Sequence, residues 1–423
     1  MAKKAGIILL AIGLLTPLLS FAGGGQESTG SEAAPAVVNL LVTSGTAAQF
    51  KAVAPIFEQD HPGVKIEISA PGWAERYTKI VTTMPVQPES LDIVGIGNDE
   101  MPGFTEGDWL VDITLPDELV NDMLPGAKEL LAYKGKTYGI PWSLAIKVFF
   151  YNEAMLKEAG FNEQPATWDE LVDMTKAMQN SGSIKHGILF GWKDVWVDYP
   201  IFSALEGLEV IIDQEGYAKF DNAQGIQAVQ YMKDLMVKEK VASPSSVSYT
   251  DHEVMTSFLG RQTPFQLHWP FIAAMIDDPE QSKIVGEGKV GLIPGNSSRK
   301  SSSVIGTMGL AVSSGSKHRD IAKEFVLFTG RRDIHKKMVL VSKEVPILES
   351  VVDDPEVQAD NPLMLLMAEQ FRYSVDMPKV IWWGEIRPLL NDNINKGVAG
   401  TASPEDAVRM AAEQINEVAE KRQ

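Results

Sequence analysis

The chain of 423 residues contains no cysteine. This absence excludes a disulfide framework, and it excludes the lipid anchor that some exported proteins carry on an N-terminal cysteine. Basic residues are also scarce, with 38 Lys and Arg against 56 Asp and Glu and a formal net charge of −18. Nucleic acids and anionic membrane surfaces bind basic surfaces, so neither is an expected partner. The negative charge is accounted for by solubility.

Signatures of cofactor chemistry and of nucleophilic catalysis are missing as well. There is no phosphate-binding loop ending in Lys-Ser or Lys-Thr, and Gly95-Ile96-Gly97 lacks the third glycine of a dinucleotide fingerprint. No Gly-x-Ser-x-Gly elbow occurs, and none of the six histidines forms a pair at metal-ligand spacing. We therefore expect no cofactor, no metal and no catalytic residue. Paired carboxylates of a glycosidase stay open, because such partners need not be close in sequence.

A long apolar run occurs only at the N-terminus. Lys3 and Lys4 precede an apolar stretch from 5 to 19, and Ser20-Phe21-Ala22 offers small residues where a signal peptidase cleaves. We predict a cleaved signal peptide over 1–22 and a flexible linker over 23–36. An uncleaved membrane anchor is the alternative, which the shortness of the run and its glycines and proline disfavour. With no lipid anchor expected, the periplasm is the predicted compartment.

The remaining chain of about 400 residues has the length of two domains. Segments 37–43, 64–68 and 91–96 have strand patterns, and Phe50, Val53, Ala54 and Phe57 show the spacing of an amphipathic helix. Strand, helix and strand in this order predict a parallel α/β sheet. Segment 304–313 is predicted to be a strand pair, followed by a helix. Ser403-Pro404-Glu405-Asp406 is typical of the start of another helix.

Segment 133–171 is dense with local signals. Lys134-Gly135-Lys136 predicts a tight turn, and the apolar run 148–151 predicts a buried strand. Asn152 and Gly160 have the character of the start and the end of a short helix. Thr167 and Glu170 have the spacing of a capping box.

The motifs in this segment resemble one family. Tyr138-Gly139-Ile140-Pro141, Tyr151-Asn152 and Thr167-Trp168-Asp169-Glu170 follow one another as in extracellular solute-binding proteins (family 1) of ABC sugar importers, in the maltose- and trehalose-binding branch. The resemblance covers nearly all of the chain beyond the linker. It implies a two-lobe, class II-like periplasmic binding fold, with two parallel-rich sheets and flanking helices joined by a hinge. The implied lobes are 37–146 with 304–346, and 147–303 with 347–423.

The same resemblance implies what the protein does. A monomer without catalytic activity would capture a sugar, a di- or oligosaccharide, in the inter-lobe cleft. It would deliver this sugar to a membrane permease that has a cytoplasmic ATPase. Two alternatives stay open: a secreted carbohydrate-active enzyme with paired carboxylates, and the same fold binding a non-sugar solute.

Nine tryptophans make stacking on a sugar ring a reasonable expectation, because an indole covers the C–H face of the ring. Trp269, in Leu267-His268-Trp269-Pro270-Phe271, matches a family Trp-Pro-Tyr motif, and Pro270 would stop a strand there. Trp168 and Trp109 are predicted to be structural. The other aromatic candidates are Trp73, Trp142, Trp196, Trp382 and Trp383, with one of the last pair expected to face the ligand.

Polar candidates follow predicted strands, at the edge where parallel α/β sheets bind ligands. Asn98 and Asp99 follow the third strand, and the family places a sugar-binding Asp there. Met308 stands where many family members have a tryptophan. The remaining candidates are Ser44, Gly45, Asp198, Thr307 and Arg372.

Overall fold

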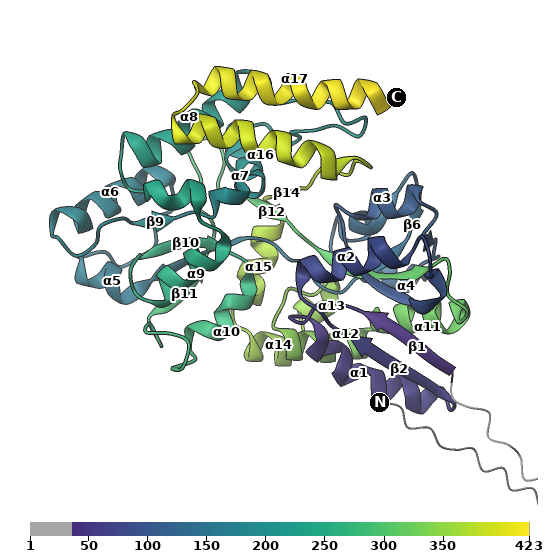
Figure 1. Ribbon diagram of the computed structural model, residues 1–423. Coiled ribbons are helices and arrows are strands. Elements are labelled where there is room, and N and C mark those ends of the chain that lie inside the picture. Colours follow the sequence, from purple (N-terminus) through teal and green to yellow (C-terminus); the bar gives the residue numbers. More distant parts are fainter. Residues whose placement is uncertain (1–35, 423) are drawn as a thin grey trace, which may run out of the picture. The chain divides into compact units, whose positions relative to one another are not determined.

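The computed structural model describes residues 36–422, and its first element is a buried strand, β1, at the centre of a parallel group (Figure 1). The predicted signal peptide and all but the last residue of the predicted linker lie outside the described residues. The first sheet has the order β2-β1-β3-β13-β4, and β7 also pairs with β13. Its strands are β1 (Ala36–Leu41), β2 (Val64–Ser69), β3 (Ile93–Gly97), β4 (Leu110–Val111), β7 (Gly139–Pro141) and β13 (Met308–Ser313).

The predicted βαβ unit is present. β1 is parallel to both β2 and β3, with Val38 opposite Ile66 and Leu40 opposite Ile93. Helix α1 (Ala47–Asp60) buries Phe50, Val53 and Phe57 in the same core as β1, which is the face that their spacing predicts.

The second sheet has the order β11-β8-β10-β9. Only β9 and β10 run parallel, whereas β8 is antiparallel to both β10 and β11. In the first sheet β13 is likewise antiparallel to β3, β4 and β7. The expectation of two parallel-rich sheets is therefore wrong in this detail, because strands that arrive from distant parts of the chain enter in the opposite direction. The strands of the second sheet are β8 (Val148–Asn152), β9 (Ile188–Leu189), β10 (Phe265–His268) and β11 (Gly288–Gly291).

Segment 304–313 forms two strands, but they do not pair with each other. β12 (Ser303–Ile305) pairs in parallel with β14 (Ser374–Asp376), whereas β13 joins the first sheet. The residues between them, Gly306 and Thr307, therefore stand where the chain passes from the small β12–β14 sheet into the first sheet.

The helices near the C-terminus pack in two places. Helices α13 and α14 contact α12, whereas α16 and α17 run alongside each other and contact α8 (Figure 1). The lobe boundaries remain a prediction. The helices after α1 are α2 (Trp73–Thr83), α3 (Met101–Glu106), α4 (Asp117–Asp122), α5 (Glu153–Glu158), α6 (Trp168–Asn180), α7 (Val195–Leu205), α8 (Ala223–Val237), α9 (Asp251–Leu259), α10 (Ala273–Ile276), α11 (Arg319–Thr329), α12 (Arg332–Ser342), α13 (Glu349–Val352), α14 (Pro355–Asp360), α15 (Met364–Phe371), α16 (Trp383–Ala399) and α17 (Pro404–Arg422).

The local signals of segment 133–171 are confirmed. Lys134 and Gly135 both have positive φ, at 47° and 76°, and they turn β5 (Ala132–Tyr133) back onto β6 (Lys136–Thr137). The Asn152 side chain accepts a hydrogen bond from the Met155 N–H and caps α5. The predicted capping box starts α6, since Thr167 and Glu170 exchange side-chain-to-backbone bonds. Across residues 36–422, none of the helices is both long and apolar enough for a bilayer span.

Candidate ligand-binding site

The carboxyl ends of β1 and β2 carry three of the predicted residues. Ser44 and Gly45 are exposed just beyond β1, and the Ser44 N–H donates to the Pro71 carbonyl at 2.8 Å. Trp73 begins α2 and leaves 53% of its surface exposed, which is unusual for an indole. Because parallel strands end at one edge of the sheet, these residues share that edge.

Asn98 and Asp99 follow β3 at the same edge. Asn98 is buried; its N–H donates to the Thr307 carbonyl at 3.0 Å and its Nδ2 donates to Asp376 Oδ1 at 2.7 Å. Asn98 thus ties β3 to strand β14. Thr307 and Met308 are also buried, so their side chains belong to the support beneath this edge.

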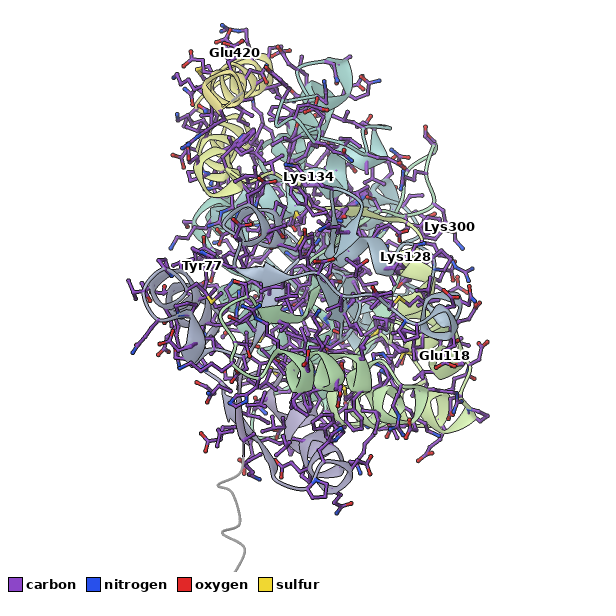
Figure 2. The ribbon with its side chains drawn as sticks, turned by 90° about the vertical axis from the view of Figure 1, so that its right-hand side faces the viewer. Tyr77, Glu118, Lys128, Lys134, Lys300 and Glu420 are labelled. Atoms are coloured by element: carbon purple, nitrogen blue, oxygen red, sulfur yellow. The ribbon has the colours of Figure 1, made fainter. Side chains whose placement is uncertain are left out.

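Asp99 is a partly buried carboxylate at this edge. Burial raises its pKa to about 7, the neighbouring Glu100 charge adds to the rise, and Arg387 of α16 opposes it. Burial and Glu100 also raise the pKa of Tyr77, again against the Arg387 charge. Figure 2 shows Tyr77 on the surface of the first-sheet region. The Arg387 guanidinium, from a helix that packs on α8, is therefore near both Asp99 and Tyr77.

Arg76 supports this edge from beneath. Its side chain is fully buried, and its Nη1 and Nη2 donate to the two carboxylate oxygens of Glu100 at 2.8 and 2.6 Å. Nη1 also donates to the Gly95 carbonyl at 2.6 Å, and the guanidinium lies 4.9 Å from the Trp73 ring centroid. Two-point pairing fixes the geometry of both groups, so α2 and the end of β3 are held together. Sequence reasoning missed this pair because its partners lie on separate elements.

Trp269 follows β10, as predicted, and its orientation is fixed from two sides. Its Nε1–H donates to Asp251 Oδ2 at 3.0 Å. A Cβ at Gly306 would lie 2.5 Å from Trp269 Cη2, so only a glycine leaves room for the ring there. The indole is partly exposed, but the hydrogen bond to Asp251 and the backbone of Gly306 fix its orientation.

A buried charge network holds Asp251 in turn. Lys147 is 1% exposed, and its Nζ lies 2.9 Å from Asp198 Oδ1 and 3.1 Å from Asp251 Oδ1. Burial works against the Lys147 charge, but the two carboxylates outweigh it and raise the pKa of this lysine. Burial tends to raise the pKa of Asp251, yet Lys147 and the Trp269 hydrogen bond hold it below its usual value. At neutral pH the network is therefore charged at Lys147 and Asp251.

This network corrects the expectation for Asp198. The side chain was expected to meet ligand, but it is 1% exposed and its Oδ1 is bound to Lys147. Burial raises the pKa of Asp198 against the opposing charge of Lys147. Lys147 and Asp251 were absent from the predicted set. The sequence does contain a signal for this network, because Lys147 directly precedes the apolar strand run Val148-Phe149-Phe150. A lysine at such a position is expected to be buried, and a buried lysine requires a carboxylate partner.

Trp196 and the Trp382-Trp383 pair lie near one another. The rings of Trp196 and Trp383 meet edge to face at 5.8 Å, and the Arg387 guanidinium lies 5.2 Å from the Trp196 ring centroid. Trp383 is 4% exposed and belongs to the core. Trp382 is partly exposed and packs on Gly216, where a Cβ would lie 2.7 Å from its ring. Of the pair, Trp382 has the exposure that ligand contact requires.

The last two candidates are Trp142 and Arg372. Trp142 is 3% exposed, meets Phe50 edge to face at 5.4 Å and lies against Gly95, so the structure corrects the expectation and gives it a core position. Arg372 is exposed at the end of α15 and makes no ion pair with any described residue. Within residues 36–422 there is also no cluster of three or more side chains suited to hold a metal ion.

Comparison with known proteins identifies the family. Residues 42–328 match the family model described as bacterial extracellular solute-binding protein. The chain belongs to the bacterial extracellular solute-binding protein family. Its curated relatives include a probable amino-acid ABC transporter periplasmic-binding protein of Sinorhizobium fredii, 22% identical over 87% of this chain and 86% of the relative. Another is the diacetylchitobiose binding protein DasA of Streptomyces coelicolor, 26% identical over 75% and 76%.

Among solved structures, the maltose-bound MalE3 of T. maritima is similar to this chain with a TM-score of 0.79. It is 22% identical, and the match covers 90% of this chain and all of that protein. The predicted two-lobe α/β fold is thereby confirmed, and so is the resemblance to sugar-type solute-binding proteins that the motifs indicated. The family match and the relatives identify the chain as a solute-binding protein of the ABC transporter type.

Proposed function

We propose that this solute-binding protein captures a di- or oligosaccharide between its two lobes and delivers it to an ABC permease in the membrane. The observation that carries this proposal is the placement of Trp269. Its indole is partly exposed, its Nε1 is held at 3.0 Å by Asp251, and Gly306 leaves space only for the ring. A rigid indole held in this way suits stacking on the apolar face of a pyranose.

The remaining contacts come from both lobes. Trp73 and Asp99, with Ser44 and Gly45, would contribute from the first sheet, and Trp269, Trp196 and Trp382 from the elements around the second. Asp99 would accept hydrogen bonds from hydroxyls, and the indoles would cover ring faces. Because a ligand shifts an equilibrium only through differential affinity, contacts from both sides would favour a closed form. The similarity to a diacetylchitobiose binding protein and to a maltose-bound protein supports this substrate class.

The buried side chains have a different role in this proposal. Asn98, Thr307, Met308 and Asp198 would position the contacting groups without touching the sugar, since each is buried. Trp142 is left out of the contact set because it packs in the core. Arg372 is left out because its exposed side chain forms no hydrogen bond or ion pair with any of the other candidates in residues 36–422.

The proposal includes the compartment and the partners. Capture of a nutrient before transport requires an exported protein, and residues 1–22 have the pattern of a signal peptide. We propose a periplasmic monomer with lobes 37–146 with 304–346 and 147–303 with 347–423. Its closed form would dock on the permease subunits, whose ATPase works on the cytoplasmic side.

Titration calorimetry with mono-, di- and oligosaccharides tests the substrate class. We expect at least one of these sugars to bind, and Trp269→Ala to weaken that binding by more than about 1 kcal/mol. Trp109 is a matched control, since it is a partly exposed indole that packs on Phe104 at 5.6 Å, away from Trp269. Trp109→Ala should lower thermal stability and leave sugar affinity unchanged. Binding of an amino acid or polyol, with no sugar bound, would refute the sugar assignment.

The amino-acid relative favours one second candidate, a charged non-sugar solute. Arg387 and Asp99 would then bind the carboxylate and the ammonium group of such a ligand. The same calorimetry with amino acids distinguishes the two. The carbohydrate-active enzyme is disfavoured by the contacts of its candidate carboxylates. Asp198 and Asp251 share Lys147, and Glu100 is held by Arg76. Release of reducing sugar from an oligosaccharide by the purified protein would overturn this argument.

A further inference from the structure

A pocket separate from the candidate ligand-binding site lies between the start of α6 and the end of α7, within the region of the second sheet. Its volume is about 130 Å³, and the residues that matter for its chemistry are Trp168, Asp169, Phe202, Leu205, Glu206 and Tyr231. We call it the α6–α7 pocket. None of these residues belongs to the candidate site described above.

The floor of the α6–α7 pocket is aromatic. The ring centroids of Trp168 and Phe202 are 5.1 Å apart, and those of Phe202 and Tyr231 are 6.2 Å apart. Trp168 and Phe202 are 1% exposed, and Tyr231 is partly exposed. Three adjacent rings with one side open to a cavity form a surface of negative π potential, which attracts cations.

Two polar groups in this floor have no partner. Trp168 Nε1 and the Tyr231 hydroxyl are buried, and neither makes a hydrogen bond with any residue of the described chain. A buried polar atom without a partner costs free energy, so such atoms are rare in native proteins and point to an absent ligand or water. Both groups can donate, so the floor requires a molecule with an acceptor atom.

The rim of the pocket carries two carboxylates. Asp169 is exposed and Glu206 is partly exposed, and neither forms a salt bridge with any Lys, Arg or His in residues 36–422. Burial raises the pKa of Tyr231, and the charges of Asp169 and Glu206 are among those that raise it further. The two carboxylates therefore act on the space in front of the Tyr231 hydroxyl, and their field is not neutralised locally.

Aromatic rings, unpaired carboxylates and free donors together define one ligand chemistry. We propose that the α6–α7 pocket binds a small organic ammonium ion that carries a hydroxyl group. The ammonium group would lie against the rings and the carboxylates of Asp169 and Glu206, and the hydroxyl oxygen would accept from Trp168 Nε1 or Tyr231. An engineered apolar cavity of about 150 Å³ admits benzene, so this pocket has the size for a ligand of roughly four to seven heavy atoms.

This proposal gives Trp168 a second role. Trp168 is the first residue of α6 and follows the N-cap Thr167. Its backbone N–H donates to the Gly295 carbonyl at 3.0 Å, and this position accounts for its burial. The start of the helix does not require the indole N–H, however, and the ring of a phenylalanine would also be apolar enough for this core. The free Nε1 is what distinguishes tryptophan here.

Proton–nitrogen correlation spectra of the tryptophan indoles test the proposal, with choline as the probe. Trp168→Phe removes one indole resonance and thereby assigns it. We expect choline to shift the Trp168 resonance in a saturable manner. The neutral isostere of choline, in which a quaternary carbon replaces the nitrogen, should shift it much less. Glu206→Gln should weaken choline binding roughly tenfold or more, as expected for loss of a charged partner.

A control and the contrary outcomes complete the experiment. Glu209→Gln changes a carboxylate in the same loop that does not line the pocket and is paired with Arg299, so choline binding should be unchanged. An unshifted Trp168 resonance would mean that the pocket holds water only, and equal binding of the neutral isostere would exclude a cation site. Either result overturns the proposal. Sugar affinity, measured on the same samples, is expected to be unaffected and reports separately on the proposed function.

Discussion

Replacement of Lys147 by methionine tests whether the buried charge network supports the site. Methionine keeps much of the length of the lysine stem but removes the Nζ that lies 2.9 Å from Asp198 and 3.1 Å from Asp251. Asp198, which is 1% exposed, would then be a buried carboxylate without its cation. Removal of one partner from a buried ion pair typically costs about 3–5 kcal/mol, and we expect a loss of that size at pH 7.

The penalty should depend on pH in a defined direction. Burial raises the pKa of Asp198, and loss of Lys147 removes the charge that opposes this rise. As pH falls through the raised pKa, Asp198 takes up a proton and its unpaired charge disappears. The difference in stability between wild type and Lys147→Met should therefore be smallest in acid and largest at neutral pH.

Denaturant unfolding followed by circular dichroism measures these free energies. The double variant Lys147→Met/Asp198→Asn should recover much of the loss, because the buried charge is gone. Lys157→Met is a matched control. It removes an exposed lysine that pairs with Glu153 at 3.0 Å, and such a surface pair is worth about 0–1 kcal/mol. A cost for Lys147→Met no larger than that of Lys157→Met would refute the reasoning.

Three further predictions concern the strand ends. Gly306→Ala places a Cβ 2.5 Å from Trp269 Cη2, so the ring must move. We expect a weaker sugar affinity in calorimetry and a loss of about 1–3 kcal/mol of stability from overpacking, and unchanged affinity would contradict the stacking role. The pKa of Asp99 is raised from 3.8 to about 7, so its contribution to stability is full below pH 3.8 and is lost as pH rises towards 7. As pH rises through this window, the free energy of unfolding of Asp99→Asn should increase relative to that of wild type by up to about 4 kcal/mol, as measured by denaturant unfolding. A stability difference that does not change with pH would exclude the raised pKa. Asn98→Ala removes the 2.7 Å bond to Asp376 and should cost about 1–3 kcal/mol of stability, against little for exposed Asn162→Ala.

The structural elements nearest in sequence were the most predictable. The Asn152 cap, the capping box of Thr167 and Glu170, and the turn at Lys134 and Gly135 all form as expected. Each depends on backbone groups within four residues, so nearby sequence contains the interaction. The amphipathic face of α1 follows for the same reason, since its spacing places Phe50, Val53 and Phe57 on one side.

Strand direction and pairing were less predictable. The two strands of segment 304–313 are present, but one joins β14 and the other joins β3. A strand pattern specifies which face is buried and contains no record of the partner strand. β8 and β13 are antiparallel to their neighbours because of the direction in which the preceding segments bring the chain to the sheet. That direction is a property of the whole fold.

The sequence alone determined the family, the α/β class, the local caps and the position of Trp269 at the end of a strand. Only the tertiary structure decided what each of these side chains touches. Lys147 meets Asp198 and Asp251 across 51 and 104 residues of chain, and no local pattern encodes such a contact. For the same reason, only the tertiary structure distinguishes Trp142, which packs in the core, from Trp269, whose Nε1 is bound by a carboxylate. Burial and ion pairing depend on every element that surrounds a side chain, whereas a turn or a cap depends only on its neighbours in sequence.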